Sequence, residues 1–291
     1  MVHLAWAIQP SHDLATLRRV NVIGTERVAR AAVEAGVRSF VYASSVGAYA
    51  PAHGDAPVDE SWPVTGVRTS FYSRHKAEVE RMLDGLEADR PEMRVVRMRP
   101  ALIFRRGAGA EVRRLFLGPL FPNALLRRPF VPIVPAVSGL RFQCVHGDDV
   151  ADAYRRAVVS DARDAFNLTA APVLRIEDHV ASLLGARPVT VSPRVARMFV
   201  DLAWRARLQP TPPGWLDMGL RAPLLRAERA RAELGWRPRV SATDALAEVL
   251  DGLREGAGEP TPTLRRHAEA RARLREFASG IGGDSGLGPS S

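Results

Sequence analysis

Residues 39–49 read SFVYASSVGAY and predict a buried strand that ends in two adjacent hydroxyl side chains. Phe40, Val41 and Tyr42 are the β-branched and aromatic residues typical of strands. Ser44 and Ser45 stand at the C-terminal end of this strand, where open parallel sheets place their ligands. The stretch therefore predicts a core strand and a candidate ligand site together.

Helical patterns flank this strand on both sides. Residues 13–35 carry apolar side chains at helical spacing and stop before Gly36, and residues 70–86 repeat the pattern after a Pro- and Gly-rich loop at 51–63. Further strands are expected at 1–7 and at 94–99, the latter stopped by Pro100. Strands that alternate with helices of this length need right-handed crossovers, so the predicted fold class is α/β with a doubly wound parallel sheet.

The regular alternation of predicted strands and long helices ends after Phe104. Gly, Pro and Arg interrupt residues 105–140, and shorter elements follow, with strands expected at 141–145, 165–168 and 188–191 and helices at 148–159, 175–184, 226–234 and 242–253. Asp148 and Asp149 stand where carboxylates cap a helix N-terminus. We divide the chain into a sheet domain (1–105), a smaller mixed α/β part interleaved with that sheet (106–255), and a polar tail (256–291) with one Arg/Ala-rich helix at 264–277 and a disordered end.

Composition bounds the class of protein. The chain has 291 residues, of which 46% are hydrophobic and 25% charged, values typical of a globular protein. The one cysteine, Cys144, excludes a disulfide scaffold and a cysteine-based zinc site. The apolar runs are too short to cross a membrane, and the N-terminus lacks the basic region of a secretory signal, so we expect a cytoplasmic protein without a membrane partner.

The net charge of +9 does not indicate nucleic-acid binding. Of the 41 basic residues only Lys76 is a lysine, and the arginines are spread along the chain among Asp and Glu instead of forming one basic stripe. The single lysine is therefore the basic residue that most needs an explanation.

Lys76 belongs to the strongest chemical signal of the sequence. Tyr72 and Lys76 are four residues apart in a predicted helix, so both side chains lie on one face. A neighbouring ammonium favours the phenolate and lowers the pKa of a tyrosine, which can then exchange a proton with a substrate hydroxyl. The competing interpretation is an ordinary surface pair on an amphipathic helix.

Several short motifs support the chemical interpretation. They are Asn21-Val22 followed by Gly24-Thr25, the Ser-Ser-x-x-x-Tyr stretch from Ser44 to Tyr49, the Tyr72–Lys76 pair, Arg99-Pro100, His146–Ala151, and Leu234-Gly235-Trp236 with Pro238. In this order and spacing, from about residue 2 to 253, the chain resembles the extended short-chain dehydrogenase/reductase family, the NAD-dependent epimerase/dehydratase group.

The resemblance implies a Rossmann-like sheet, NAD or NADP as cofactor, and a small-molecule substrate with a reacting hydroxyl or carbonyl. It implies that Tyr72 is the general acid/base, that Lys76 lowers its pKa and holds the nicotinamide ribose, and that Ser45 rather than Ser44 holds the substrate oxygen, with Asn21 in support. The residues implied to contact the cofactor are Ala5, Ser44, Tyr72, Lys76, Pro100 and Ile103. We expect no metal, because a helix cap accounts for the aspartates beside His146.

This family begins with a strand, a Gly-rich turn and a helix that hold the cofactor pyrophosphate, and this chain starts later. We therefore expect an N-terminally truncated sheet with an exposed edge at residues 2–7, poor stability and weak NADH affinity. Two explanations stay open: a shortened reading of an active oxidoreductase, or a non-catalytic remnant that acts as a binding or regulatory module.

The substrate is less well indicated. Val46 and Gly47 follow Ser45 where dehydratases of the family carry an acidic pair, and residues 101–105 lack the family's sugar-nucleotide pattern. Apolar residues suggest a less polar alcohol or carbonyl, namely Trp6, Phe104, Phe116, Leu117, Leu120 and Phe121. The resemblance also implies a homodimer through the helices at 12–35 and 70–88. It leaves open NAD or NADP, and epimerase or reductase.

Overall fold

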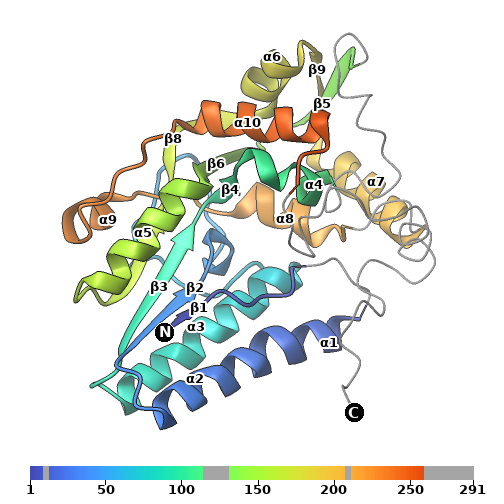
Figure 1. Ribbon diagram of the computed structural model, residues 1–291. Coiled ribbons are helices and arrows are strands. Elements are labelled where there is room, and N and C mark those ends of the chain that lie inside the picture. Colours follow the sequence, from blue (N-terminus) through green and yellow to red (C-terminus); the bar gives the residue numbers. More distant parts are fainter. Residues whose placement is uncertain (9–12, 114–130, 207–210, 259–291) are drawn as a thin grey trace.

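A four-stranded parallel sheet forms the centre of the molecule in the computed structural model, which describes residues 1–8, 13–113, 131–206 and 211–258 (Figure 1). Its strand order is β1-β2-β3-β7, with β1 at Val2–His3, β2 at Ser39–Ala43, β3 at Arg94–Pro100 and β7 at Asp164–Leu168. Val41 lies opposite Val2 on one side and Val96 on the other. The predicted α/β fold class is confirmed.

Helices cover both faces of this sheet (Figure 1). The helical segment before β2 consists of α1 (Leu14–Arg18), a π-helical turn (Arg19–Ile23) and α2 (Gly24–Glu34), and it shares one face with α3 (Phe71–Asp89). The other face carries α5 (Gly147–Val159) and α9 (Glu228–Glu233). Alternate residues of β2 supply the two cores: Phe40 and Tyr42 pack toward α2 and α3, and Val41 packs toward α5.

The second half adds smaller sheets beyond the carboxyl end of β3. One has the order β4-β6-β8 and the other pairs β5 with β9. Its elements are β4 (Leu102–Phe104), a 3-10 turn (Arg106–Ala108), α4 (Gly109–Val112), β5 (Ile133–Val137), β6 (Arg141–His146), β8 (Ala170–Arg175), a π-helical turn (Ile176–Val180), α6 (Ala181–Leu184), β9 (Arg187–Val191), α7 (Pro193–Arg205), α8 (Gly214–Arg221) and α10 (Ala242–Glu255).

Two local predictions need correction. The strand expected over residues 1–7 is only two residues long, because the chain after His3 leaves the sheet. The cap of α5 is His146, whose ring accepts a hydrogen bond from the Asp148 backbone N–H at 3.2 Å. Asp149 instead accepts hydrogen bonds from the backbone of Arg239 and Val240, so it ties α5 to the segment before α10.

Some predictions lie outside the described residues. They are the helix at 264–277, the disordered tail, and the apolar residues Phe116, Leu117, Leu120 and Phe121. Across the ranges that are described, no helix combines the length and apolar character needed to span a membrane.

Candidate active site

Tyr72 and Lys76 face the carboxyl end of β2 from the first turns of α3. The helix begins there because Ser70 caps it, with its hydroxyl accepting from the Ser73 backbone N–H. The Ser73 hydroxyl donates to the Gly47 carbonyl and accepts from the Val67 N–H at 2.6 Å. Ser73 thereby fixes the start of α3 against the loop that follows β2.

The side chains of Ser45 and Tyr72, the pair expected on the substrate side, lie near one another, and their role in holding a substrate stays a prediction. The Ser45 hydroxyl is close enough to the Tyr72 phenol to act on its pKa, which it lowers. Ser45 also caps a 3-10 turn (Val46–Ala48), with Oγ accepting from the Gly47 N–H at 3.0 Å. A Cβ at Gly47 would lie 2.9 Å from the Tyr72 ring, so only glycine lets the tyrosine approach this loop.

Lys76 is buried at 3% exposure on the same helix face as Tyr72. Its ammonium donates to the Ala43 carbonyl at 2.6 Å and more weakly to the Tyr42 hydroxyl at 3.4 Å. The ring of Trp6 covers it, with 3.6 Å from Nζ to the ring centroid. Burial lowers the pKa of Lys76 well below its ordinary value, and the carboxylate of Glu80 opposes that shift only in part.

Tyr72 lies between aromatic rings from distant parts of the chain. Trp215 packs against it at 4.9 Å between ring centroids and Trp6 meets it edge-on at 6.1 Å, with Met218 in the same cluster. Burial raises the pKa of Tyr72 to about 12, against the lowering effect of the Ser45 hydroxyl. The expected lowering of this pKa by Lys76 is therefore not what this structure shows, because the indoles exclude water from the phenol.

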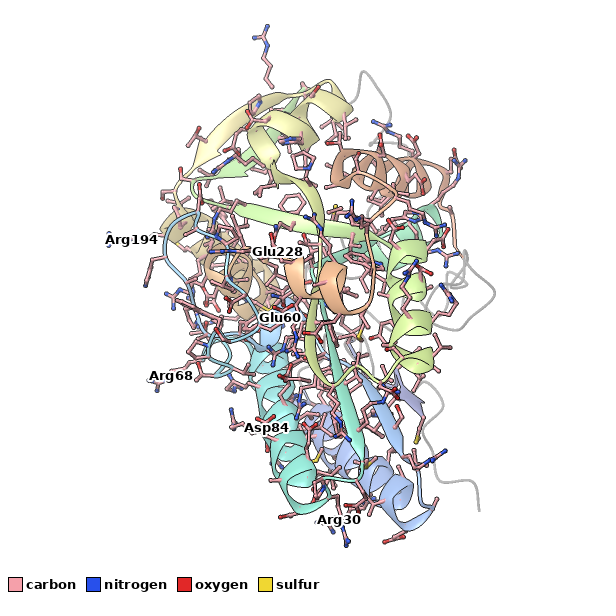
Figure 2. The ribbon with its side chains drawn as sticks, turned by 90° about the vertical axis from the view of Figure 1, so that its left-hand side faces the viewer. Arg30, Glu60, Arg68, Asp84, Arg194 and Glu228 are labelled. Carbon is pink, nitrogen blue, oxygen red and sulfur yellow. The ribbon has the colours of Figure 1, made fainter. Side chains whose placement is uncertain are left out.

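Ser44 is separated from this group. Its hydroxyl donates to Glu80, which forms a buried ion pair with Arg99. The network continues through Tyr49, which accepts from Arg99 and donates to Asn167, each at 2.8 Å. Figure 2 labels Glu60 and Asp84, two outer members that bind the Asn167 backbone and Arg97 respectively. The side chain of Ser44 thus serves the core, and cofactor contact by Ser44 stays a prediction.

The other predicted site residues do not contact Tyr72. Asn21 is buried, and its amide makes two hydrogen bonds to the Ala7 backbone, at 2.7 and 2.9 Å, so it clamps the chain next to Trp6 rather than touching Tyr72. Ala5 is exposed just after β1. Pro100 is buried at the end of β3, and Ile103 is 45% exposed on β4.

Sequence reasoning missed part of this site. Trp6 was expected as a lining residue and does contact the tyrosine, whereas Phe104 packs in a different cluster with Phe142. Trp215, Met218 and Ser73 were not expected in the site. Trp215 lies 143 residues from Tyr72 in the sequence, and only the tertiary fold joins the two. No cluster of three or more metal-ligating side chains occurs among the residues that the structure describes.

Comparison with known proteins identifies the family of this chain. Residues 2–169 match the model of the NAD dependent epimerase/dehydratase family. The chain belongs to this family. Members of this family use NAD, and the sheet and helices described above are the Rossmann-like fold that the sequence predicted.

Solved structures extend the likeness in fold. The protein gox2253 matches with a TM-score of 0.66 at 21% identity, over 89% of this chain and 79% of its own. The UDP-glucose 4-epimerase of Thermotoga maritima, solved with UDP-glucose, matches with 0.61 at 18%, over 87% and 76%. RMD from Pseudomonas aeruginosa, solved with NADPH, matches with 0.61 at 16%, over 87% and 79%. No curated protein sequence matches the chain.

Proposed function

We propose that this chain carries the proton-transfer site of an NAD(P)-dependent oxidoreductase or epimerase that acts on a hydroxyl or carbonyl substrate. The observation that carries the proposal is the approach of the Ser45 hydroxyl to the Tyr72 phenol, with the Lys76 ammonium one helical turn away and 5.8 Å from the Tyr72 ring centroid. Three groups from two elements converge there, at the end of a parallel strand where ligands bind in such sheets.

The residues present fit one part of the cofactor. The Lys76 ammonium donates one hydrogen bond to the Ala43 carbonyl, and on another side it contacts only the Trp6 ring. An N–H donor on that side could bind a hydroxyl of the nicotinamide ribose, which the family places there. When bound, the nicotinamide would supply or accept the hydride.

Tyr72, Ser45 and Lys76 could together transfer a proton to the substrate oxygen. With its pKa raised to about 12, Tyr72 holds its proton at neutral pH and is ready to donate it to a carbonyl oxygen. Ser45 would hold that same oxygen. The phenolate left behind would be stabilised by the Ser45 hydroxyl and the Lys76 ammonium until product release readmits solvent, which returns the proton. This arrangement favours the reductive direction at neutral pH.

The substrate that we favour is a small, weakly polar ketone or aldehyde. Support comes from the apolar surroundings of Tyr72, where Trp6, Trp215 and Met218 lie. The UDP-sugars named for solved relatives are the other candidates. The alternative function, a non-catalytic module, is favoured by one observation: Lys76 and Tyr72 are almost wholly covered.

The test is NADH- or NADPH-linked reduction of a panel of aryl and alkyl carbonyls, with millimolar cofactor, followed by loss of NADH absorbance. Replacing Tyr72 by Phe removes the donated proton, and we expect turnover to fall about 10²- to 10⁴-fold. Tyr154→Phe removes a phenol from α5 and serves as the matched control, with turnover retained. Equal turnover by wild type and Tyr72→Phe, or no turnover of any carbonyl or UDP-sugar, would favour the non-catalytic module.

A further inference from the structure

The indole of Trp6 occupies the open side of Lys76. Its centroid lies 3.6 Å from Nζ, closer than the rings of Tyr42 at 5.0 Å and Tyr72 at 5.8 Å. At this distance the ammonium is attracted to the face of the ring. Trp6 is itself only partly buried, so it forms the boundary between Lys76 and solvent.

The hydrogen bonds of Lys76 show what the indole replaces. An ammonium has three N–H donors. One donates to the Ala43 carbonyl and a second is directed weakly to the Tyr42 hydroxyl, whereas no carboxylate hydrogen-bonds Nζ within the described residues. The remaining direction meets only the Trp6 ring, in the place where an oxygen acceptor of a ligand would bind.

The backbone beside Trp6 is held, but the ring is not held by a polar contact. Asn21 fixes the Ala7 backbone through two hydrogen bonds. In contrast, the indole Nε1 is buried and has no hydrogen-bond partner in the described part of the chain. An unpaired buried donor is unfavourable, so a rotamer that returns this N–H to water or to a ligand recovers part of that cost. Rotation of one side chain then uncovers Lys76 while the clamp stays in place.

We propose that Trp6 is a displaceable cover on Lys76 and Tyr72, which a ligand turns aside when its hydroxyl oxygen takes the position of the indole on Lys76. The identity of that ligand rests on the proposed function, but the cover rests on the contacts of this chain alone. Trp6 is a positioning residue in this inference, because it acts through Lys76.

Reductive methylation with formaldehyde and cyanoborohydride tests the cover directly, because Lys76 is the only lysine and the Met1 amine is an internal reference. In the wild type, peptide mass spectrometry should show slow modification of Lys76 relative to Met1. In Trp6→Ala the Lys76 rate should rise about tenfold or more, the factor that corresponds to an opening free energy of about 1.4 kcal/mol. Trp62→Ala, which removes an exposed loop indole without a ring contact to Lys76, should keep the wild-type rate.

Circular dichroism and thermal melting establish that the variants are folded. If Trp6→Ala does not fold, Trp6→Phe replaces it; because its ring is smaller, Lys76 should be methylated faster than in the wild type but more slowly than expected for Trp6→Ala. A wild-type Lys76 rate in either folded Trp6 variant overturns the cover, as does fast modification of Lys76 in the wild type. Added NADH separates the two proposals. Renewed protection of Lys76 in Trp6→Ala by NADH supports both, whereas exposed Lys76 without protection by NADH supports the cover and contradicts the proposed cofactor site.

Discussion

Glu80 brings a carboxylate into the core at 1% exposure, directly behind the candidate active site. Arg99 donates to both of its oxygens, the Ser44 hydroxyl donates to one, and Arg97 lies within 3.9 Å. Because a buried charge is tolerated only when it is paired, loss of either partner leaves the other uncompensated. This ion pair fixes the end of β3 against α3, the helix that carries Tyr72 and Lys76.

Replacing Glu80 by Gln should lower the free energy of unfolding by about 3–5 kcal/mol, because the Arg99 charge would stay buried without its counterion. Denaturant unfolding followed by circular dichroism measures this. Glu78→Gln on the same helix is the control, since its pair with Arg18 is exposed and should contribute about 0–1 kcal/mol. A similar small loss for both variants would contradict the structural role of Glu80.

The candidate residues differ in how well sequence alone placed them. Tyr72, Lys76 and Ser45 were predictable, because helical spacing and a strand end determine their positions locally. The roles of Ser44 and Asn21 were not, since their partners Glu80 and Ala7 are chosen by tertiary packing. The same holds for the raised pKa of Tyr72, which depends on how indoles from remote segments exclude water.

At the scale of elements, α10 lies very close to the 3-10 turn and the short helix α4 that follow β4. A Cβ on Gly252 would lie 2.1 Å from the Arg106 carbonyl oxygen, and one on Gly109 would lie 2.4 Å from the Gly252 carbonyl carbon. The two glycines allow α10 to lie directly against the turn and short helix that follow β4. The contacts are backbone to backbone, so no side-chain rotation can relieve a clash.

Gly252→Ala should therefore destabilise the protein by about 1–3 kcal/mol through overpacking, although alanine is the better helix former. For Gly85→Ala on α3 we expect the opposite effect, because nothing lies within 4 Å of the added Cβ. The free energy of unfolding should rise by about 0.5–1 kcal/mol. Thermal unfolding of both variants compares them. A stabilising Gly252→Ala would show that α10 does not pack this closely.

Elements of the first half were predictable because long periodic segments bury one face against the sheet, as α2 and α3 do. In the second half, α7 and α8 and the strands β4, β5 and β8 escaped prediction. The strands β5 and β8 and the helix α8 contain proline or glycine, and β4, β5 and β8 pair with strands far along the chain. The 13-residue α7 has no such interruption after Pro193, and its helical pattern was missed. Local pattern therefore determined the Rossmann-like part, and tertiary contacts determined the rest.

For the whole molecule, stability should depend on pH through His3 in the edge strand β1. His3 is 6% exposed, and its Nε2 lies 3.0 Å from the Thr25 hydroxyl, which itself donates to the Asn21 carbonyl. Burial, and secondarily the charge of Lys76, lower the pKa of His3. The pKa of His75 is lowered as well, mainly by burial.

The unfolded chain therefore binds more protons than the folded chain below the ordinary histidine pKa of about 6.5, so the free energy of unfolding should fall as pH drops from about 7 toward 5. His3→Gln, which keeps an N–H donor for Thr25, should flatten this slope, and His53→Gln in an exposed loop should leave it unchanged. Urea unfolding across this pH range measures the slopes. An unaltered slope in His3→Gln would show that His3 titrates alike in both states.

The outer side of β1 remains unpaired in the described part of the chain, and Val2 and Leu4 are exposed there at 41% and 62%. Such an edge can pair with other chains, so the expected poor stability stays a prediction for which this edge gives a structural reason. A homodimer through α1, α2 and α3 likewise stays a prediction.

The Met1 ammonium donates to the Ser39 carbonyl at 2.6 Å and marks the end of the sheet opposite the active site. With the chain's sole ε-amine enclosed, an amine-reactive biosensor chip would capture every molecule by this single point. All copies would then stand in one orientation, with the carboxyl ends of β2 and β3 directed toward the flowing analyte.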